Sequence, residues 1–269
     1  MPERGRSAGG SLGASAGESS AGAAGHRRTV RSELAWRLVR AVLGDQITAT
    51  GRSVLDVVDA GGGTGTLAVP VAELGHHVTV VDPSPDSLAA LERRAAEARV
   101  TDRIHAVQGD AVALSDIVGP ASTDLVLCHS VLEVVDDPAV ALQSMAEVLR
   151  TAGALSVVVA NPNAVVLAKV LGGHIAEARQ ALTDPAGRWG AADPMPRRFT
   201  VEQLRDVVEQ TGLQVVAEHG LRVFADLVPG ALSDEPGLAG MLLELEAEAA
   251  EDPTFRALAS QIHLLARRI

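Results

Sequence analysis

The chain has 269 residues, 47% of them hydrophobic and only 2% aromatic, and a formal charge of −11. This length and composition predict one globular domain with a large aliphatic core. The acidic balance disfavours nucleic-acid binding over the whole surface, the single cysteine excludes an internal disulfide, and no apolar run reaches membrane-spanning length.

From this composition we expect a cytoplasmic protein with no membrane contact and no metal site. Residues 1–28 are mostly Gly, Ser and Ala, too poor in large apolar side chains to offset the entropy of ordering, so a disordered tail is expected there and a folded domain over 29–269. Apolar residues from Leu34 to Leu43 recur at helical spacing and predict a helix that ends near Gly44. Arg31, at its start, could meet a ligand carboxylate or could be an exposed charge.

The segment from Val54 to Asp82 predicts a strand, a glycine turn, a helix and a second strand. Val54 to Val58 is the β-branched run of a buried strand, which Asp59 is expected to end. The turn contains Gly61, Gly62, Gly63 and Gly65, and the second strand finishes at Asp82. A turn with so few side chains allows a ligand to approach the backbone closely.

Two cofactor motifs compete for this turn. A dinucleotide fingerprint needs Gly-x-Gly-x-x-Gly, but counting from Gly61 places Thr66 at the last position. The pattern present is Asp59-x-Gly61-x-Gly63-x-Gly65, which resembles the first motif of the class I S-adenosylmethionine-dependent methyltransferases. Asp82, about 20 residues on, is placed like the acidic residue that grips a ribose through both hydroxyls. A purely structural glycine turn is the alternative interpretation.

Strands and helices continue to alternate after Asp82. Ser84 is expected to cap a helix, Ile104 to Val107 to form a strand, and Leu125 to Cys128 to form another. Asp110, followed by Ala111 and Val112, could reach an adenine amino group or could cap a helix. His129 follows a strand at the carboxyl edge, where parallel sheets bind ligands, and would otherwise be an ordinary loop histidine.

A helix over 139–149 and a strand over 154–160 complete an alternation that implies a parallel sheet with helices on both faces. Residues 161–199 then interrupt it, and such an insertion is expected to cover the substrate. The candidates in this insertion for orienting the substrate are His174, Arg197 and Arg198. The two arginines are candidates because guanidinium groups hold carboxylates or phosphates with paired hydrogen bonds. The alternative for both arginines is solvated charge before the helix that Thr200 caps.

The C-terminal part predicts a helix over 201–210, a sixth strand over 213–219, helices over 238–250 and 255–259, and a last strand over 261–267. Arg222 follows the sixth strand and could lie near the crevice. An antiparallel strand inserted beside the sixth is how the seven-stranded sheets of these methyltransferases end. The resemblance therefore implies a Rossmann-like, mostly parallel seven-stranded sheet.

Beyond the general class, the chain resembles the bacterial tRNA 5-carboxymethoxyuridine methyltransferases, which methylate the carboxylate of a modified wobble uridine. The resemblance rests on the segments DAGGGTG, HSVLEVVDDP, GLRVFAD, LLELE and HLLARR, and on Asn161. It implies S-adenosyl-L-methionine as cofactor, with Arg31 on the methionine carboxylate, Gly61 and Gly62 on the amino-acid and ribose portion, Asp82 on the ribose, Asp110 to Val112 on the adenine, and His129 at the methionine end.

The expected reaction is direct methyl transfer to tRNA, by a monomer or a homodimer. A carboxylate acceptor would need no general base, whereas a hydroxyl or amine would need one, with His129 or His174 as candidates. The acidic charge favours a small-molecule acceptor as the alternative. A noncatalytic S-adenosylmethionine-binding protein is a third hypothesis, and a nicotinamide oxidoreductase, disfavoured by Thr66, is a fourth.

Overall fold

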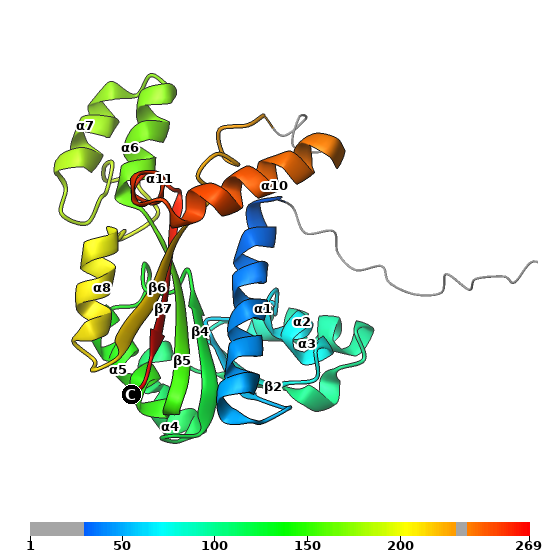
Figure 1. Ribbon diagram of the computed structural model, residues 1–269. Coiled ribbons are helices and arrows are strands. Elements are labelled where there is room, and N and C mark those ends of the chain that lie inside the picture. The colour runs from blue at the N-terminus through cyan, green and yellow to red at the C-terminus, as the bar shows by residue number, and fades with distance from the viewer. Residues whose placement is uncertain (1–29, 230–235) are drawn as a thin grey trace, which may run out of the picture.

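The computed structural model describes residues 30–229 and 236–269, so the expected tail over 1–28 lies outside the described residues. One seven-stranded sheet of order β3-β2-β1-β4-β5-β7-β6 forms the centre of the molecule (Figure 1). Strands β1 to β5 pair in parallel, whereas β7 is antiparallel to both β5 and β6. The predicted mostly parallel sheet with an antiparallel last strand is confirmed.

The predicted βαβ unit is present with shifted bounds. It consists of β1 (Asp56–Ala60), α2 (Ala68–Glu73) and β2 (His77–Asp82). The expectation that Asp59 ends the first strand is wrong, because Asp59 pairs within β1 and is only 3% exposed. A buried carboxyl inside a strand is rare enough that sequence patterns read it as a terminator.

Helix α1 (Val30–Thr50) continues past Gly44, where the sequence predicted its end. The later turns are fixed by tertiary contacts, since the buried Gln46 side chain donates to the carbonyls of Asp124 at 2.9 Å and Ala152 at 3.1 Å. These hydrogen bonds join α1 to two strands of the sheet. They outweigh the weak local tendency of glycine to stop a helix.

The middle of the chain follows the predicted alternation. It contains α3 (Pro85–Glu97), η1 (Thr101–Arg103), β3 (Ile104–Gln108), η2 (Ala111–Ala113), α4 (Leu114–Val118), β4 (Thr123–His129), α5 (Pro138–Val148) and β5 (Leu149–Ala160). The predicted cap Ser84 accepts a hydrogen bond from the Ser87 N–H. Strand β5 begins five residues earlier than predicted, through an irregular pairing with β4.

The insertion forms a helical hairpin of α6 (Pro162–Leu171) and α7 (Ile175–Thr183), for which the sequence predicted no elements. Then follow α8 (Val201–Glu209), whose Thr200 and Gln203 form a capping box, β6 (Gln214–Leu221), α10 (Pro236–Glu251), α11 (Pro253–Arg256) and β7 (Gln261–Arg267). Within the described ranges, no helix is long and apolar enough to cross a bilayer.

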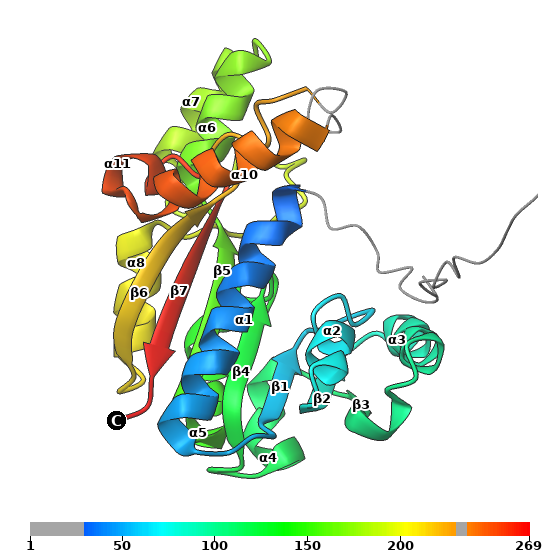
Figure 2. The same ribbon diagram turned by 45° about the vertical axis from the view of Figure 1, so that its right-hand side comes forward.

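Helices cover both faces of the sheet (Figures 1 and 2). Helices α1, α2 and α3 pack on one face, against alternate residues such as Leu125 and Leu127 of β4, and α10 lies beside the start of α1. Helices α4, α5 and α8 pack on the other, against Val126 and Cys128. The hairpin of α6 and α7 projects beyond the end where β5 finishes (Figure 1).

Candidate functional site

The strand ends at the carboxyl edge bring several predicted site residues together. Ala60 pairs with Val81 of β2 and with Cys128 of β4, and Asp82 pairs with Gln108 of β3. Gly61 follows Ala60, His129 follows Cys128, and Asp110 comes two residues after Gln108. The glycine turn, the Asp82 carboxylate and the start of η2 therefore lie on neighbouring strand exits.

The glycine turn depends on positions that tolerate no side chain. Gly61, Gly63 and Gly65 have φ values of +69°, +53° and +78°, a region that L-residues rarely adopt. A Cβ on Gly61 would lie 2.4 Å from Cγ2 of Val131, and one on Gly62 would lie 2.5 Å from the Asp59 carboxyl. The turn is thus packed tightly between Asp59 and the segment after β4.

Asp82 is held by backbone hydrogen bonds on both carboxylate oxygens. Oδ2 accepts from the Gly63 N–H and Oδ1 from the Ser84 N–H, each at 2.9 Å, and the residue is 8% exposed. A carboxylate offers about four acceptor positions. Two therefore remain for donors of a ligand, and the geometry suits a vicinal diol.

Asp59 lies behind the glycine turn, and its carboxyl has a raised pKa. Burial, with a smaller contribution from the negative charge of Asp82, raises the pKa of Asp59 to about 7, while a hydrogen bond from the Ala68 N–H opposes that rise. Asp59 therefore exists in both protonation states near neutral pH. Its contacts with Gly62 make it a support of the turn.

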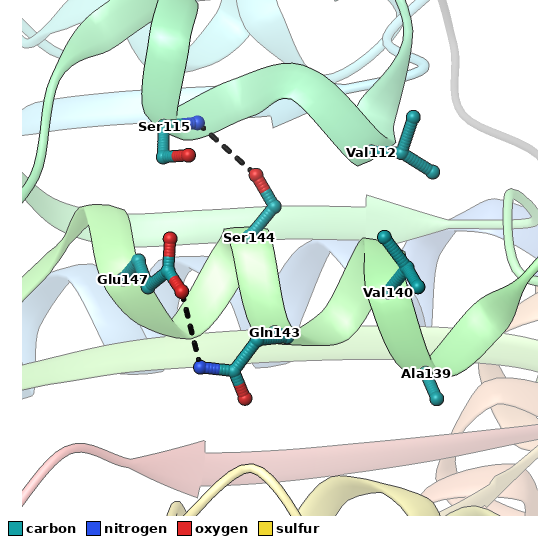
Figure 3. Close-up of a pocket in the computed structure, with 7 residues that line it drawn as sticks. All are labelled: Val112, Ser115, Ala139, Val140, Gln143, Ser144 and Glu147. Atoms are coloured by element: carbon teal, nitrogen blue, oxygen red, sulfur yellow. Dashed lines mark hydrogen bonds between the residues drawn. The ribbon is translucent and has the colours of Figure 1, made fainter.

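Asp110 caps η2, because its Oδ1 accepts a hydrogen bond from the Val112 N–H at 3.0 Å. Ala111 is buried, whereas Asp110 is exposed. Beside Val112 a groove runs between η2, α4 and α5, where Ser144 Oγ accepts from the Ser115 N–H at 3.1 Å (Figure 3). Neither Asp82 nor the glycine turn lines this groove.

Arg31 and Arg222 share one carboxylate at the carboxyl edge. Arg31 Nε lies 2.9 Å from Asp226 Oδ1, and Arg222 Nη2 lies 2.7 Å from the same carboxylate. Nε of Arg222 is buried and makes no hydrogen bond within the described residues. Two guanidinium groups facing one carboxylate leave an excess positive charge, so an anion is favoured here.

The other predicted substrate-orienting residues have structural partners or lie far from this edge. The Arg197 guanidinium donates to the carbonyls of Leu132, Val135 and Asp136, and Arg198 forms a buried ion pair with Asp193 at 2.7 Å. His174 is exposed at the tip of the α6–α7 hairpin, about 15 Å along the helix axis from the start of α6.

His129 lies at the end of β4, and its Nε2 is 2.9 Å from Ser156 Oγ. Burial lowers the pKa of His129 to about 4, so the imidazole is neutral at physiological pH. Ser130, which follows, has φ of +60° and turns the chain toward Val131 and the glycine turn.

Sequence reasoning missed the acidic residues that hold these loops. Glu246 of α10 is 1% exposed and accepts hydrogen bonds from the N–H groups of Val223, Phe224 and Ala225. Glu133, also 1% exposed, accepts from the Ala160 N–H. The signal for Glu246 was its position in line with Leu242 and Ala249 on the apolar face of a helix.

Comparison with known proteins identifies similar chains. A family model described as a methyltransferase domain matches residues 58–157. The tRNA 5-carboxymethoxyuridine methyltransferase of Escherichia coli O157:H7 is 30% identical over 241 residues, which cover 89% of this chain and 88% of that protein. The ubiquinone biosynthesis O-methyltransferase of Cupriavidus pinatubonensis is 33% identical over 107 residues, 40% of this chain and 42% of that protein.

Solved structures show a similar fold. An S-adenosylmethionine-dependent methyltransferase from Mesorhizobium loti superposes with a TM-score of 0.58 at 20% identity, over 87% of this chain and 97% of that one. Magnesium protoporphyrin IX methyltransferase from Synechocystis, with bound S-adenosylhomocysteine, superposes with a TM-score of 0.56 at 17% identity, over 89% of this chain and 86% of that one.

Proposed function

Because this chain belongs to the class I S-adenosylmethionine-dependent methyltransferases, in the family of the bacterial tRNA 5-carboxymethoxyuridine methyltransferases, we propose that it methylates the carboxylate of 5-carboxymethoxyuridine in tRNA. The observation that carries the proposal is the extent of the similarity. It spans 89% of the chain for the tRNA enzyme but about 40% for the ubiquinone enzyme. Similarity over the insertion and the C-terminal elements favours a shared acceptor as well as a shared cofactor.

The cofactor is S-adenosylmethionine, and the residues at the carboxyl edge fit it. Asp82 has two acceptor positions left for the ribose hydroxyls, beside a turn without side chains. Arg31 keeps guanidinium donors beyond Asp226 for the methionine carboxylate. In this proposal Gly61 and Gly62 border the amino-acid portion, Asp110 to Val112 the adenine, and His129 the methionine end.

When bound, the cofactor supplies a methyl group already activated on a sulfonium. The residues of this chain then contribute mainly alignment, and such ordering can lower a barrier by roughly 7–11 kcal/mol. A carboxylate acceptor is ionised at neutral pH and needs no general base. Arg222, with its unpartnered Nε, is better placed to orient it than Arg197 or Arg198, whose guanidinium groups already bind the protein.

The test is methyl transfer by the purified chain to tRNA that carries 5-carboxymethoxyuridine. Nucleoside mass spectrometry should detect the methyl ester after incubation with S-adenosylmethionine, and tRNA lacking the carboxymethoxy group should remain unmodified. Cofactor binding without ester formation on this tRNA would reject the proposed acceptor.

A small-molecule acceptor is the second candidate, favoured by the formal charge of −11. It predicts no steep salt dependence of activity, whereas phosphate contacts with tRNA make binding fall strongly as salt rises. A hydroxyl acceptor would also require a general base, for which His129 at the end of β4 is better placed than His174 at the tip of the α6–α7 hairpin. Cofactor binding without turnover on either acceptor class would favour the noncatalytic alternative.

A further inference from the structure

Four polar side chains form a line across four neighbouring strands. Ser156 Oγ on β5 lies 2.9 Å from Nε2 of His129 on β4 and 3.0 Å from Nε2 of His263 on β7. Nδ1 of His263 lies 3.0 Å from Nδ1 of His219 on β6, its register partner. Ser156 and His263 are 0% and 2% exposed, among aliphatic residues of the face that α1 covers.

Each short contact needs one donor and one acceptor. A Ser156 hydroxyl that accepted from both histidines would leave its own hydrogen unpaired in the core, which is costly, so two fully paired proton arrangements remain when all three imidazoles are neutral. In the first, His129 donates from Nε2 to Ser156, Ser156 donates to Nε2 of His263, and His263 donates from Nδ1 to His219. In the second, every bond runs in the opposite direction. His129 and His219 therefore share one tautomer, and His263 has the other.

Neutral imidazoles are expected from the surroundings. Burial lowers the pKa of His129, His219 and His263. The charged groups acting on His219 are Glu251 of α10 and its neighbour Glu218, which raise its pKa, and Arg256 of α11, which lowers it. Apart from burial, the pKa of His263 is lowered only by the other two histidines.

The two outer nitrogens are open to other partners. Over residues 30–229 and 236–269, Nδ1 of His129 and Nε2 of His219 make no hydrogen bond. Neither histidine is fully buried. His129 lies beside the strand end that leads into the glycine turn. The line thus connects the carboxyl edge of the central strands with the far edge strand.

We propose that Ser156 and His263 are positioning residues that determine which nitrogen of His129 carries the proton, so that His129 and His219 change tautomer together. Switching from the first arrangement to the second takes up one proton at Nδ1 of His129 and releases one from Nε2 of His219 to water, so the line stays neutral. Nδ1 of His129 then presents either an acceptor or a donor at the site. The inference uses the proposed function only in placing His129 beside the cofactor.

The test is the tautomer of each histidine in the full chain labelled with 15N-histidine, measured by two-bond 1H–15N correlation spectra with and without S-adenosylhomocysteine. The wild type should show equal fractions of the Nδ1–H form for His129 and His219, and the complementary fraction for His263, in both states. Ser156→Ala should make the fractions at His129 and His219 unequal, and Ser156→Thr, which keeps the hydroxyl, should restore the match.

Ser144→Ala is the matched control, because it removes a buried serine hydroxyl from α5, on the other face of the sheet. It should leave the three tautomers unchanged. Unmatched fractions in the wild type, or a match that survives Ser156→Ala, would overturn the inference. The wild-type spectra decide the first point even if a variant fails to fold. Ester formation on tRNA is measured separately, so failure of the proposed acceptor is distinguishable.

Discussion

Asp59 and Asp82 are two carboxyl groups near one glycine turn, and their environments give them different tasks. Asp82 accepts two backbone N–H groups and retains acceptor capacity toward the site. Asp59 lies within β1, 3% exposed, against Gly62. The first is suited to hold a ligand and the second to support the backbone that the ligand approaches.

Replacing Asp82 by Ala should weaken S-adenosylhomocysteine binding. The loss of charge-assisted hydrogen bonds to the ribose should cost roughly 1.5–3 kcal/mol, or about tenfold to more than a hundredfold in affinity. Titration calorimetry measures this, with Asp86→Ala, an exposed carboxylate on α3, as the control. Unchanged affinity in Asp82→Ala would remove this residue from the cofactor site.

Asp59→Asn should change how stability depends on pH. A pKa near 7 in the folded state and an ordinary value in the unfolded state mean that the folded chain binds more protons between these values. The wild type should therefore lose up to roughly 4 kcal/mol, relative to Asp59→Asn, as pH rises from about 4 to about 8. Urea unfolding at several pH values measures the difference.

The exposed Asp102→Asn serves as a control, because it removes a carboxyl that lies outside the core. A pH-independent difference for Asp59→Asn would show that the buried carboxyl keeps an ordinary pKa.

The glycine turn and Asp82 were predictable from sequence because their spacing is local. The partners of the arginines were not. Arg197 binds carbonyls of residues 132, 135 and 136, more than 60 positions away. Arg222 has a buried Nε without a partner. A charge pattern reveals that a guanidinium is present, but only the folded chain decides which donors stay available.

Among the elements, the segment after β6 connects the site to α10. Glu246 holds the N–H groups of residues 223–225 at 2.6 to 2.9 Å, and Asp226, directly afterwards, binds Arg31 and Arg222. One buried carboxylate therefore orders the loop that carries Arg222 and the Asp226 carboxylate, to which Arg31 of α1 also binds.

Glu246→Gln should loosen this loop. An amide cannot accept three N–H groups as a carboxylate does, and its own NH₂ would face donors, so the free energy of unfolding should fall by about 1–3 kcal/mol. Amide hydrogen exchange at residues 223–225 should accelerate. Glu244→Gln, exposed on the same helix, should change neither quantity. Slow exchange at 223–225 in Glu246→Gln would mean that other contacts hold the loop.

Amphipathic patterns in the sequence predicted most helices and strands. They failed where tertiary contacts determine whether an element forms and where it ends. Helix α1 passes Gly44 because Gln46 docks on two strands. The α6–α7 hairpin was read only as an insertion, because five large apolar residues on these helices, Leu167, Val170, Leu171, Ile175 and Leu182, remain exposed and blur the helical pattern.

For the whole molecule, four buried or half-buried histidines should make the fold sensitive to mild acid. Burial lowers the folded-state pKa of His76, His129, His219 and His263, whereas the unfolded chain binds protons near pH 6.5. The unfolded state then holds more protons, so stability should fall as pH drops from about 6.5 toward 4.

Urea unfolding in the Asp59→Asn background, which removes the opposing contribution, measures this loss. A further loss should begin as pH falls into the usual aspartate range, where the unfolded chain takes up protons, because arginine partners outweigh burial and lower the folded-state pKa of Asp56, Asp193 and Asp226. Constant stability from pH 6.5 to 4.5 would contradict neutral histidines in the folded state.

The parallel character of the sheet was predicted, since alternation implies it, but the position of β7 came from family resemblance. Alternation carries no information about which strands are neighbours. Nor did it indicate that His219 and His263, 44 positions apart, pair in register.

The position of β7 in the sheet has a consequence for synthesis of the chain. Strand β6 ends at Leu221, yet β7, its only neighbour in the sheet among the described residues, begins at Gln261. At roughly 5–20 residues per second, a ribosome delivers the missing neighbour seconds after β6 has emerged. During that interval the nascent chain holds two unpaired edges, on β5 and β6, so slow translation between these codons should favour capture by chaperones or misassembly with another nascent copy.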